Sequence, residues 1–557
     1  MWVRGAGVET LRTMWRPAFR RFPSERKVAL CRAPREAYSP PVDRSGRLAA
    51  AIGVGFVLLV FLVELAAILI LNAGHFTYTL DDAYIHLALA ERIHGGHYGV
   101  NAGELAAPSS SIVWPFLLAP LAPWAVGEYL PLLINLGAAL GTAFILNALL
   151  TRSLSRDRSA GSPYLQPFVL VLLLLCTDTL GLVFTGMEHS LQVFLSAAVL
   201  LGLVREAETR TVPKWLIAAL VAGPLVRYEN LALSAGGLLF LLARGHRRSA
   251  ALAAAIILLT VGAFSGFLVH LGLGPVPASV VDKSPIVSHG GVTGAVQAIR
   301  RNLAEPRGIM LVIAMLGLAS AAASRSTRPE ERLLAGTIAL VVAAHLAAGR
   351  IGWYSRYDVS ISAVTLLAIL YVARDGLARW IEQTKAVIAA ALAVLWSAAI
   401  GGYYVVGLIH VPLGASNIEE QQFQMHRFAT EYYRAPVAVN DLGYVAFRNP
   451  GYVLDLMGLA SPELQGLAEE PTDPSWMNDA TRRHGVELAM VYDSWFPKRP
   501  PNWRKVGELR LGRKRVTVAG DTVAFYGLTG SGYRRGVEAA KSFAGTLPRG
   551  ARFVFTE

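Results

Sequence analysis

Two adjacent carboxylates, Asp81 and Asp82, stand just after a long apolar stretch, in the segment TLDDAYIHLALAERIHGG. An acid in such a place can accept a proton as a general base. It can also cap a helix and favour its positive N-terminal end. Because one acid is enough for a cap, the pair leaves a carboxylate available for chemistry.

Further polar residues occur in short segments between apolar runs. TGMEHS contains Glu188, VRYENL contains Arg227 and Glu229, GPVPASVVDKSP contains Lys283, and GRIGWYSRYD contains Arg356. Carboxylates can position hydroxyl groups, and Lys and Arg can bind phosphate oxygens. Taken singly, each cation could instead be an interfacial residue whose stem lies along lipid.

Other kinds of chemistry have weaker support in the sequence. His86, His94 and His97 lack the HExxH spacing of a zinc site. The two cysteines, Cys31 and Cys176, lie in a basic N-terminal tail and an apolar run, so we expect neither a disulfide nor a cysteine metal site. The sequence contains no Walker, Rossmann or kinase motif, and we expect no nucleotide-driven reaction.

The composition indicates that a membrane positions these residues. Only 16% of the 557 residues are charged, 54% are hydrophobic and the mean hydropathy is +0.43, whereas a soluble protein carries roughly 25% charged residues. The net charge of +13 falls in short clusters between apolar runs, which is typical of topology signals and not of nucleic-acid binding. The first apolar run begins near Leu48, so residues 1–47 are predicted to be a basic cytoplasmic tail and not a signal peptide.

Apolar runs of about 17 to 25 residues predict about eleven transmembrane helices. The segment 111–127 is short and contains three prolines, and we expect it to lie at the membrane without crossing it. The predicted spans are 48–72, 129–150, 164–185, 187–203, 213–226, 229–243, 249–273, 308–324, 333–348, 359–373 and 386–409.

The positive-inside rule orients these spans. Five loops carry three basic residues each, and all five fall on the cytoplasmic side if 111–127 does not cross; they are 152–158, 205–214, 244–248, 325–332 and 374–385. The loop 73–128 and residues 410–557 then lie outside. The strand-like runs PVAVNDLGYVAF and ELAMVYDSW predict a soluble α/β or α+β domain over 410–557, after a transmembrane domain over 48–409. Within the outer loop, residues 81–96 are predicted to form an amphipathic helix along the membrane surface.

The stretch from Thr79 to Pro120, TLDDAYIHLALAERIHGGHYGVNAGELAAPSSSIVWPFLLAP, resembles the first outer loop of the GT-C glycosyltransferase superfamily. It is most similar to the branch that includes the mycobacterial terminal arabinofuranosyltransferases. FTGMEHSL, VRYENLAL, GPVPASVVDKS and GWYSRYDVSI are similar to later segments of that branch, in the same order. The resemblance covers about residues 45–410. The chain departs from the branch in having Tyr228–Glu229 where Pro-Asp is usual, and in lacking an aromatic residue before Lys283, which leaves the donor sugar open.

The resemblance implies a GT-C fold and an inverting glycosyltransferase, that is, a hexosyl- or pentosyltransferase. Such an enzyme would move a sugar from a polyprenyl-phosphate donor to a cell-envelope glycan or lipid acceptor, on the outer face of a bacterial inner membrane. A pentose such as arabinofuranose is one candidate sugar. Asp81 or Asp82 would be the catalytic base, and the other would hold the geometry or, in some relatives, a divalent metal. No other cofactor is expected.

The resemblance also assigns roles to the remaining polar residues. Lys283, Arg356 and Arg227 would stabilise the phosphate that leaves with the lipid. The residues expected to position the substrate are Glu188, Tyr84, His86 and Glu229.

Two other classes of protein remain as alternatives. A transporter or flippase of lipid-linked sugars would need polar residues across the membrane, and the predicted spans offer mainly Glu64 and Asp178. A receptor or scaffold would not need about eleven spans for anchoring. The concentration of polar residues on one face favours the transferase.

Overall fold

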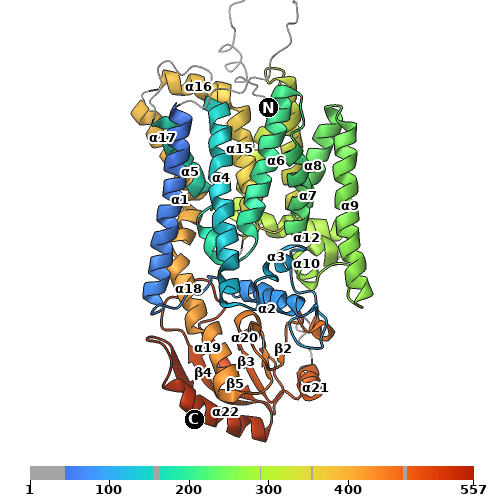
Figure 1. Cartoon of the computed structure of the whole chain (residues 1–557), viewed down its shortest axis with the longest axis vertical. Coiled ribbons are helices and arrows are strands. Elements are labelled where there is room, and N and C mark those ends of the chain that lie inside the picture. The colour runs from blue at the N-terminus through green and yellow to red at the C-terminus, as the bar shows by residue number, and fades with distance from the viewer. Residues whose placement is uncertain are drawn as a thin grey trace, which may run out of the picture. The chain divides into compact units, whose positions relative to one another are not determined.

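The structure, a computed structural model, describes residues 44–154, 164–288, 290–352, 356–384, 386–467 and 473–556. It contains a helical bundle followed by a C-terminal domain with a mixed six-stranded sheet (Figure 1). The predicted fold class, a mostly α-helical polytopic membrane protein with a C-terminal α/β or α+β domain, is confirmed. Nearly all of the predicted tail 1–47, including Cys31, lies outside the described residues, and the domain boundary near His410 stays a prediction.

Among the described residues, seven helical segments are long and apolar enough to cross a membrane. An eighth span is formed if α17 and the helices after it count as one segment, bent by 41° near His410. The seven are α1 (Arg44–Leu71), η1–α4 (Ala125–Tyr129 and Leu130–Leu154), α5–η2 (Leu165–Cys176 and Gly181–Thr185), α6 (His189–Thr209), α9 (Arg247–His270), α13 (Pro306–Ala323) and α14 (Pro329–Ala348); α17 is Ala386–Ile409.

The predicted number of about eleven spans is larger than this count. Three of the predicted spans are the shorter apolar helices α7 (Lys214–Val226), α8 (Asn230–Ala243) and α15 (Val359–Val372). Helices of 13 or 14 residues are about 20 Å long, which is less than the roughly 30 Å of a bilayer core. The apolar runs predicted the bounds of these three helices to within one residue, but they were counted as full spans.

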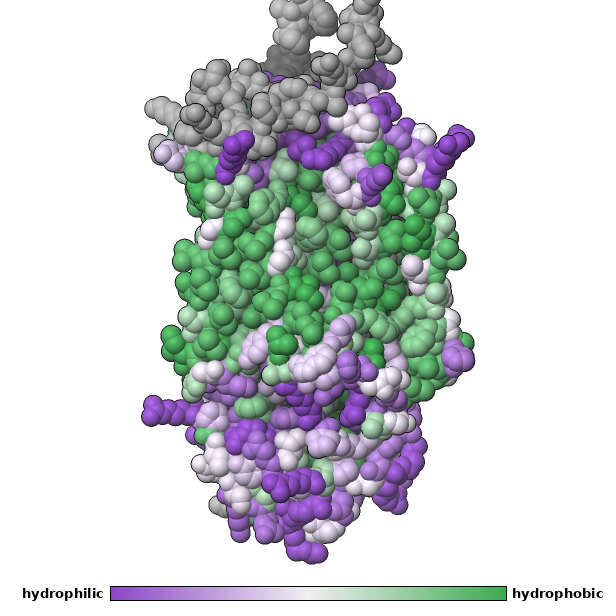
Figure 2. Space-filling view, in the orientation of Figure 1, coloured by the Kyte–Doolittle hydropathy of each residue, from purple (hydrophilic) through white to green (hydrophobic). Residues whose placement is uncertain are grey.

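The outer surface of the bundle is apolar. Leu62 in α1, Leu258 in α9 and Ile313 in α13 are all more than half exposed, at 59%, 73% and 65%. Figure 2 shows a continuous apolar belt between polar ends. Exposed apolar side chains of this number are expected where helices contact lipid.

The segment 111–127 forms no helix of spanning length, as predicted. It contains only the short helix α3 (Trp114–Leu118) and turns that lead into η1. The long loop after α9 carries three further short helices: α10 (Ala278–Lys283), α11 (Pro285–Ser288) and α12 (Gly291–Leu303). Another short helix, α16 (Arg374–Gln383), precedes α17.

The strands of the C-terminal domain are ordered β2-β1-β3-β5-β4-β6. The first three are parallel, and Ala438 in β1 pairs with Leu454 in β2 and Ala489 in β3. The other pairs are antiparallel. The strands are β1 (Val437–Val439), β2 (Val453–Asp455), β3 (Leu488–Val491), β4 (Arg504–Arg510), β5 (Thr522–Gly527) and β6 (Arg552–Phe555). The helices are α18 (Val411–Glu420), α19 (Gln422–Arg427), η3 (Phe428–Tyr433), α20 (Gly443–Ala446), η4 (Pro462–Leu464), α21 (Ser475–Arg483) and α22 (Gly530–Ala544).

The helix α2 (Asp82–His94) lies between the bundle and the sheet (Figure 1). It ends at Gly95 and is followed by Gly96, as the sequence predicts. However, all eight residues of Ala83–Ala90 are buried, because the bundle covers one side of the helix and α20 packs against it from the C-terminal domain. The helix is therefore covered by both parts of the molecule over most of its length, and its place along the membrane surface stays a prediction.

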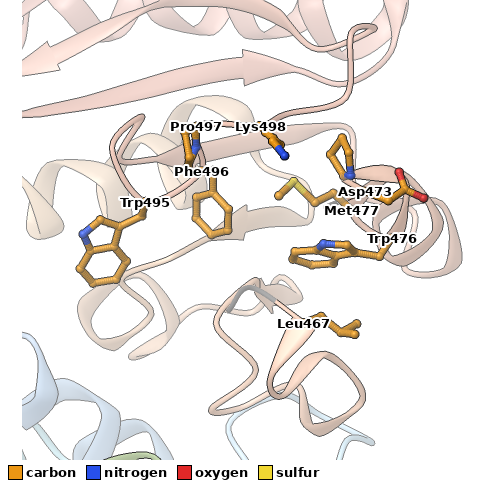
Figure 3. Close-up of a pocket in the computed structure, with 9 residues that line it drawn as sticks. Leu467, Asp473, Trp476, Met477, Trp495, Phe496, Pro497 and Lys498 are labelled. Carbon is orange, nitrogen blue, oxygen red and sulfur yellow. The ribbon is translucent and has the colours of Figure 1, made fainter. Parts of the chain in front are cut away.

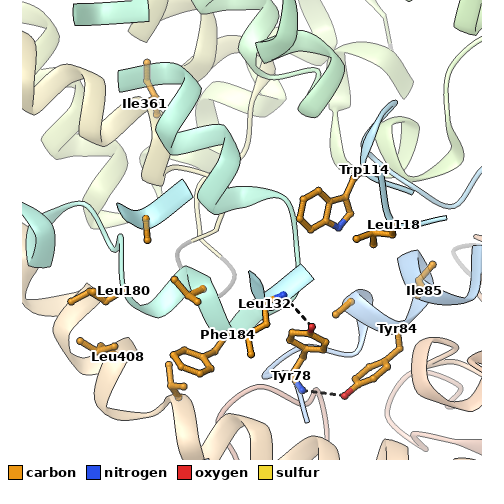
Figure 4. Packing of buried hydrophobic residues seen from close by; sticks show 14 of the residues in the cluster. Tyr78, Tyr84, Ile85, Trp114, Leu118, Leu132, Leu180, Phe184, Ile361 and Leu408 are labelled. Carbon is orange, nitrogen blue, oxygen red and sulfur yellow. Dashed lines mark hydrogen bonds between the residues drawn. The ribbon is translucent and has the colours of Figure 1, made fainter. Parts of the chain in front are cut away.

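The segment before α2 is fixed to the bundle by two tyrosines (Figure 4). The Tyr78 hydroxyl accepts a hydrogen bond from the Leu132 amide at 3.2 Å and donates one to the Glu128 carbonyl at 2.6 Å. The Tyr84 hydroxyl accepts one from the Tyr78 amide at 3.1 Å. The backbone entering Asp81 is thus held in place on the side of the bundle.

The loop 73–128 is also attached to the C-terminal domain. His75 and Glu419 form an ion pair at 2.6 Å. The Asn101 side chain makes two hydrogen bonds with the backbone of Val453, at 2.9 and 3.0 Å. These contacts place the acidic pair at the junction between the two parts of the molecule.

Candidate active site

The two aspartates at the start of α2 face different partners. The Asp81 carboxylate accepts hydrogen bonds from the backbone amides of Gly443 and Tyr444, at 2.7 and 2.8 Å. Asp82 Oδ2 lies 2.6 Å from Arg356 Nη1. No side chain caps α2, so a helix cap does not account for the pair.

The contact at Asp81 depends on glycine at position 443. A Cβ atom on Gly443 would lie 2.0 Å from the Asp81 carbonyl oxygen and 2.7 Å from its carboxylate. Any other residue would push α20 away from α2. The hydrogen bonds between Asp81 and α20 therefore require this close backbone approach.

A third acid, Asp441, joins this site from the C-terminal domain. Its Oδ2 accepts hydrogen bonds from the Tyr492 hydroxyl at 2.8 Å and from Gln422 Nε2 at 2.9 Å. Burial and the neighbouring Asp441 charge raise the pKa of Asp81 well above its usual value, although the two amides oppose the shift. Burial also raises the pKa of Asp441.

The electrostatics of Asp82 are opposite to those of Asp81. Burial alone would raise the pKa of Asp82, but the positive charges of Arg356 and Lys283 outweigh this effect and lower it to about 2. Asp82 is therefore an ionised partner of Arg356 at neutral pH. Two adjacent residues thus hold carboxyl groups of very different acidity.

Four cationic side chains surround the ring of Tyr357. The charged groups of Arg356, Arg350, Arg227 and Lys283 lie 5.0, 5.5, 5.8 and 5.9 Å from the ring centre. Arg356 Nη2 also donates a hydrogen bond to the Tyr357 hydroxyl at 3.0 Å. Burial would raise the pKa of Tyr357, but Arg356 and Lys283 lower it below its usual value. This cation group is a candidate anion-binding site.

The cations differ in how far they are already neutralised. Buried Arg227 is paired with Glu188 at 2.7 Å and, in a two-pronged contact, with Glu229 at 2.7 and 3.1 Å. Within the described parts of the chain, Lys283 and Arg350 form no ion pair. A phosphate would therefore find its free positive charge on Lys283 and Arg350, beside the partly neutralised Arg356.

The residues predicted to position the substrate are mostly buried behind this site. His86 Nε2 lies 3.6 Å from Glu188 Oε2, and burial lowers the pKa of His86 although Glu188 and Asp82 oppose the shift. Tyr84 is fully buried and its ring lies 3.9 Å from that of Tyr444. Glu229 is the most exposed of the four, with 22% of its side chain accessible. Their roles toward a substrate stay predictions.

The acids were also candidates for a divalent metal. Both Asp81 oxygens accept backbone amides, and Asp82 is paired with Arg356. In the described ranges, no group of three His, Cys, Asp or Glu side chains is placed to hold a metal ion. These donors do not fit a divalent cation, because it would compete with an arginine and two amides for the same oxygens.

Asp441 and Tyr357 were not among the candidates that the sequence provided. Asp441 follows β1 by two residues, in VNDLGY, at the carboxyl end of a parallel strand. Ligand sites of α/β sheets lie at this end of the strands, so an acid in this place was a usable signal. Tyr357 gave no signal of its own beyond its position next to Arg356.

A separate pocket lies within the C-terminal domain (Figure 3). Trp476, Trp495 and Phe496 line it together with Lys498. None of its lining residues belongs to the acids or cations described above.

Comparisons with known proteins gave one family match and several similar structures. A family described as a Domain of unknown function (DUF8728) matches residues 416–526. This range contains Asp441 and Tyr492, but it does not contain Asp81, Asp82 or any of the cations. No curated protein sequence matches the chain.

The similar solved structures include an arabinofuranosyltransferase and an oligosaccharyltransferase. The arabinofuranosyltransferase AftD from Mycobacteria matches at a TM-score of 0.40 and 14% identity, over 85% of this chain and 41% of that one. This chain thus spans less than half the length of AftD. The oligosaccharyltransferase of Archaeoglobus fulgidus in its apo form matches at 0.40 and 12%, over 87% and 77%. The Archaeoglobus fulgidus oligosaccharyltransferase AglB, in complex with an inhibitory peptide and a dolichol-phosphate, matches at 0.39 and 12%, over 90% and 76%.

Proposed function

We propose that this protein is an inverting membrane glycosyltransferase, which moves a sugar from a polyprenyl-phosphate donor to a glycan or lipid acceptor of the cell envelope. The observation that carries the proposal is the meeting of two kinds of group at one place. The ion pair between Asp82 and Arg356 connects the acidic pair, Asp81 and Asp82, to the cation group around Tyr357. A base beside an anion site is what the transfer requires.

The proposed chemistry uses each side of this arrangement. The acceptor hydroxyl gives its proton to a carboxylate while its oxygen attacks the anomeric carbon of the donor sugar. The bond between that carbon and the phosphate oxygen breaks, and the phosphate leaves with the electron pair. Lys283, Arg350 and Arg356 stabilise the negative charge that develops there.

Asp81 is the better candidate for the base. The pKa of Asp82 is about 2, so Asp82 is a weak base at neutral pH, whereas the pKa of Asp81 is raised. A general base is most effective when its pKa lies near the working pH. Asp82 is then the residue that orients Arg356 toward the phosphate.

The surroundings suit a lipid-linked donor. The apolar belt of the bundle offers a lipid environment for the polyprenyl tail (Figure 2), and the acids lie at the end of this belt. Because the basic loops lie at the opposite end, the positive-inside rule supports the proposal that the acids face the outside of a bacterial inner membrane. A pentose such as arabinofuranose is the first donor sugar to test.

The arrangement of charge favours a transferase over a flippase. Buried ion pairs occur at the two ends of the bundle: Glu206 with Arg244 at one end, and Arg227 with Glu188 at the other. A transport path would instead need polar groups along the whole length of the bundle. Asp178, one of the two acids predicted within spans, lies in the break between α5 and η2.

The proposal is tested with purified protein, a radiolabelled polyprenyl-phospho-sugar and acceptor glycans. We expect Asp81→Asn to lower kcat by about 10²- to 10⁴-fold, the usual contribution of a general base.

Lys283→Ala should raise the KM for the donor, because it removes a free cation from the anion site. Lys498→Ala, at the separate pocket of the C-terminal domain, is the matched control and should behave as wild type. Full activity in both Asp81→Asn and Asp82→Asn would overturn the assignment of the pair.

A further inference from the structure

We infer that the helix α12 (Gly291–Leu303) lies in the plane of the membrane surface, with one apolar edge among the phospholipid acyl chains of the leaflet next to the C-terminal domain. This lipid contact holds the anion site at the depth of a lipid-linked phosphate. The consequence for the donor lipid rests on the proposed function. The placement of the helix does not, and it can be measured separately.

The surface of α12 is divided lengthwise into three sides. A helix advances by about 100° per residue, so residues three and four apart share one side. One side is buried against the protein: Gly294, Ala298 and Asn302. A second side is apolar and 81%, 48%, 37% and 40% exposed at its four positions: Val292, Val296, Ile299 and Leu303. The third side is polar and exposed: Thr293, Gln297 and Arg300.

This division of the exposed surface is typical of a helix at a membrane interface. The 13 residues of α12 are too few to cross a bilayer core, and a crossing helix would be apolar on every side that lipid contacts. Here an apolar edge and a polar edge both run the length of the helix. The first can reach acyl chains while the second reaches water only if the helix axis lies in the plane of the surface. From there, Arg300 can extend its charge toward the lipid phosphates.

The apolar edge of α12 continues into the lipid-facing surface of the bundle, and lipid is therefore the occupant that we assign to it. The helix lies near the end of the bundle that faces the C-terminal domain (Figure 1). It packs against α13, which begins at Pro306, three residues after the exposed Leu303. α13 is long and apolar enough to cross a membrane, and its Ile309 and Ile313 are 50% and 65% exposed.

The buried side of α12 holds the segment that carries Arg350. The Asn302 Nδ2 atom donates hydrogen bonds to the Leu346 and Gly349 carbonyls, at 2.9 and 3.0 Å. The Asn302 Oδ1 atom accepts one from the Ile351 amide at 3.1 Å. Arg350 stands between Gly349 and Ile351, so α12 fixes the backbone on both sides of this cation.

Lys283 is attached to the same assembly. It ends α10, and the next residue, Ser284, donates a hydrogen bond from its hydroxyl to the Ala348 carbonyl at 3.1 Å. The two cations that form no ion pair in the described ranges, Lys283 and Arg350, are thus tied to one unit whose outer side is the apolar edge of α12. The phosphate of a lipid-linked donor lies at the level of the headgroups, because its tail lies among the acyl chains. A helix anchored at this level brings both cations to the phosphate.

Spin labelling of the full chain in phospholipid vesicles tests the placement without any substrate. With both native cysteines replaced by serine, nitroxides are attached to Val296→Cys and Gln297→Cys, and their collisions with oxygen and with a water-soluble nickel chelate are measured. Oxygen concentrates among acyl chains, so its access relative to that of the chelate should be severalfold higher at Val296 than at Gln297. Leu258→Cys, on the exposed side of α9, is the lipid control, and Asp479→Cys, exposed on the C-terminal domain, is the water control.

Two results would overturn the placement. In the first, the label at Val296 meets the nickel chelate as often as the label at Gln297 does, which would put the apolar edge in water. In the second, the label at Val296 is shielded from both reagents, which would mean that protein, such as a second copy of this chain, covers the edge in place of lipid.

Transfer kinetics in vesicles test the consequence for the donor. The double variant Val292→Asn with Val296→Asn makes the edge polar. It should raise the KM for a long-chain polyprenyl-phospho-sugar severalfold, with kcat unchanged and with an unchanged KM for a water-soluble, short-chain analogue. Gln297→Asn, on the polar side, is the matched control and should behave as wild type. An equal rise in both KM values, or no rise in either, would contradict the role in setting depth. Wild-type protein that transfers no sugar would instead remove the proposed function and leave the spin-label result to decide on the helix.

Discussion

Asp81 and Asp82 show how neighbouring residues with the same side chain can acquire opposite chemistry. Successive side chains at the start of a helix point about 100° apart. Asp81 therefore faces the amides of α20, while Asp82 faces Arg356. The first carboxyl is desolvated and close to another acid, whereas the second is paired with a cation, so the pKa of the first rises and that of the second falls.

This difference predicts opposite effects on stability. The folded state lowers the pKa of Asp82 to about 2, so Asp82 stabilises the fold above about pH 4, and this contribution is lost as the pH falls toward 2. Asp82→Asn should destabilise the protein at neutral pH by about 1 to 2 kcal/mol, allowing for solvent screening of a side chain that is one third exposed.

Asp81 changes the stability of the fold with pH in the opposite direction. Its raised pKa means that the folded state binds a proton more strongly than the unfolded state, so stability falls as the pH rises from about 4 through the folded pKa. Asp81→Asn should flatten this slope, which amounts to about 1.4 kcal/mol per pH unit for one proton. Thermal unfolding of both variants in detergent, between pH 4 and 8, measures these effects. Equal destabilisation by the two substitutions would contradict the assigned environments.

At the residue scale, the sequence identified candidate site residues where they are adjacent or lie in loops between apolar runs. The adjacency of Asp81 and Asp82, and the placement of Lys283 and Arg356 in loops between apolar runs, identified groups that the fold gathers at one junction. Asp441 was not predicted as a site residue, because Asp81 lies 360 residues away from it along the chain. Only the packing of α20 on α2 brings Asp81 and Asp441 together, and the spacing of residues along the chain does not indicate that contact.

The elements around Arg227 explain why a predicted phosphate ligand is engaged elsewhere. Arg227 ends α7, Glu229 precedes α8 and Glu188 precedes α6, so one guanidinium joins the ends of three helices. The turn before Glu188 also needs Gly186, which has φ of +68° and would bring a Cβ atom within 2.5 Å of Ala83. The polar residues of this junction hold helices together.

This junction predicts that Arg227→Ala and Glu229→Gln lower the free energy of unfolding by different amounts. Glu188 is fully buried, whereas Glu229 is 22% exposed. Arg227→Ala would leave Glu188 as a buried, uncompensated charge and should cost about 3–5 kcal/mol of unfolding free energy. Glu229→Gln should cost much less, because Arg227 keeps Glu188 and water reaches position 229. Denaturation in mixed detergent micelles compares the two variants. A larger loss for Glu229→Gln than for Arg227→Ala would refute this account of the junction.

The number of spans, and not the bounds of the helices, is where the hydropathy prediction differs from the structure. The apolar runs at 213–226 and 229–243 do form helices, but α7 and α8 are too short to cross a bilayer core unaided. The predicted runs were already shorter than the roughly 17 to 25 residues of a full span, and local contacts fix where the two helices end. Pro213 before α7 and the contact of Arg227 with two acids set those ends here.

At the scale of the whole molecule, the two polar ends are distinguished by charge and by content. One end carries short basic loops, and the other carries the acids, the cation group and the C-terminal domain. The positive-inside rule predicts that the basic loops are cytoplasmic. The domain and the candidate site would then lie on the outer face, where a lipid-linked sugar donor and an envelope acceptor can meet.

Cysteine labelling in intact cells tests this orientation. Lys498 in the C-terminal domain and Arg248 at the start of α9 are both exposed, and they lie beyond opposite ends of the apolar belt. With both native cysteines replaced by serine, Lys498→Cys should react with a membrane-impermeant maleimide in intact cells. Arg248→Cys should react only after the cells are permeabilised, because the three basic residues of its loop hold it inside. If only Arg248→Cys were labelled in intact cells, the orientation would be opposite to the predicted one. It would place the acids on the cytoplasmic face, and an outer-face acceptor would no longer be compatible with the site.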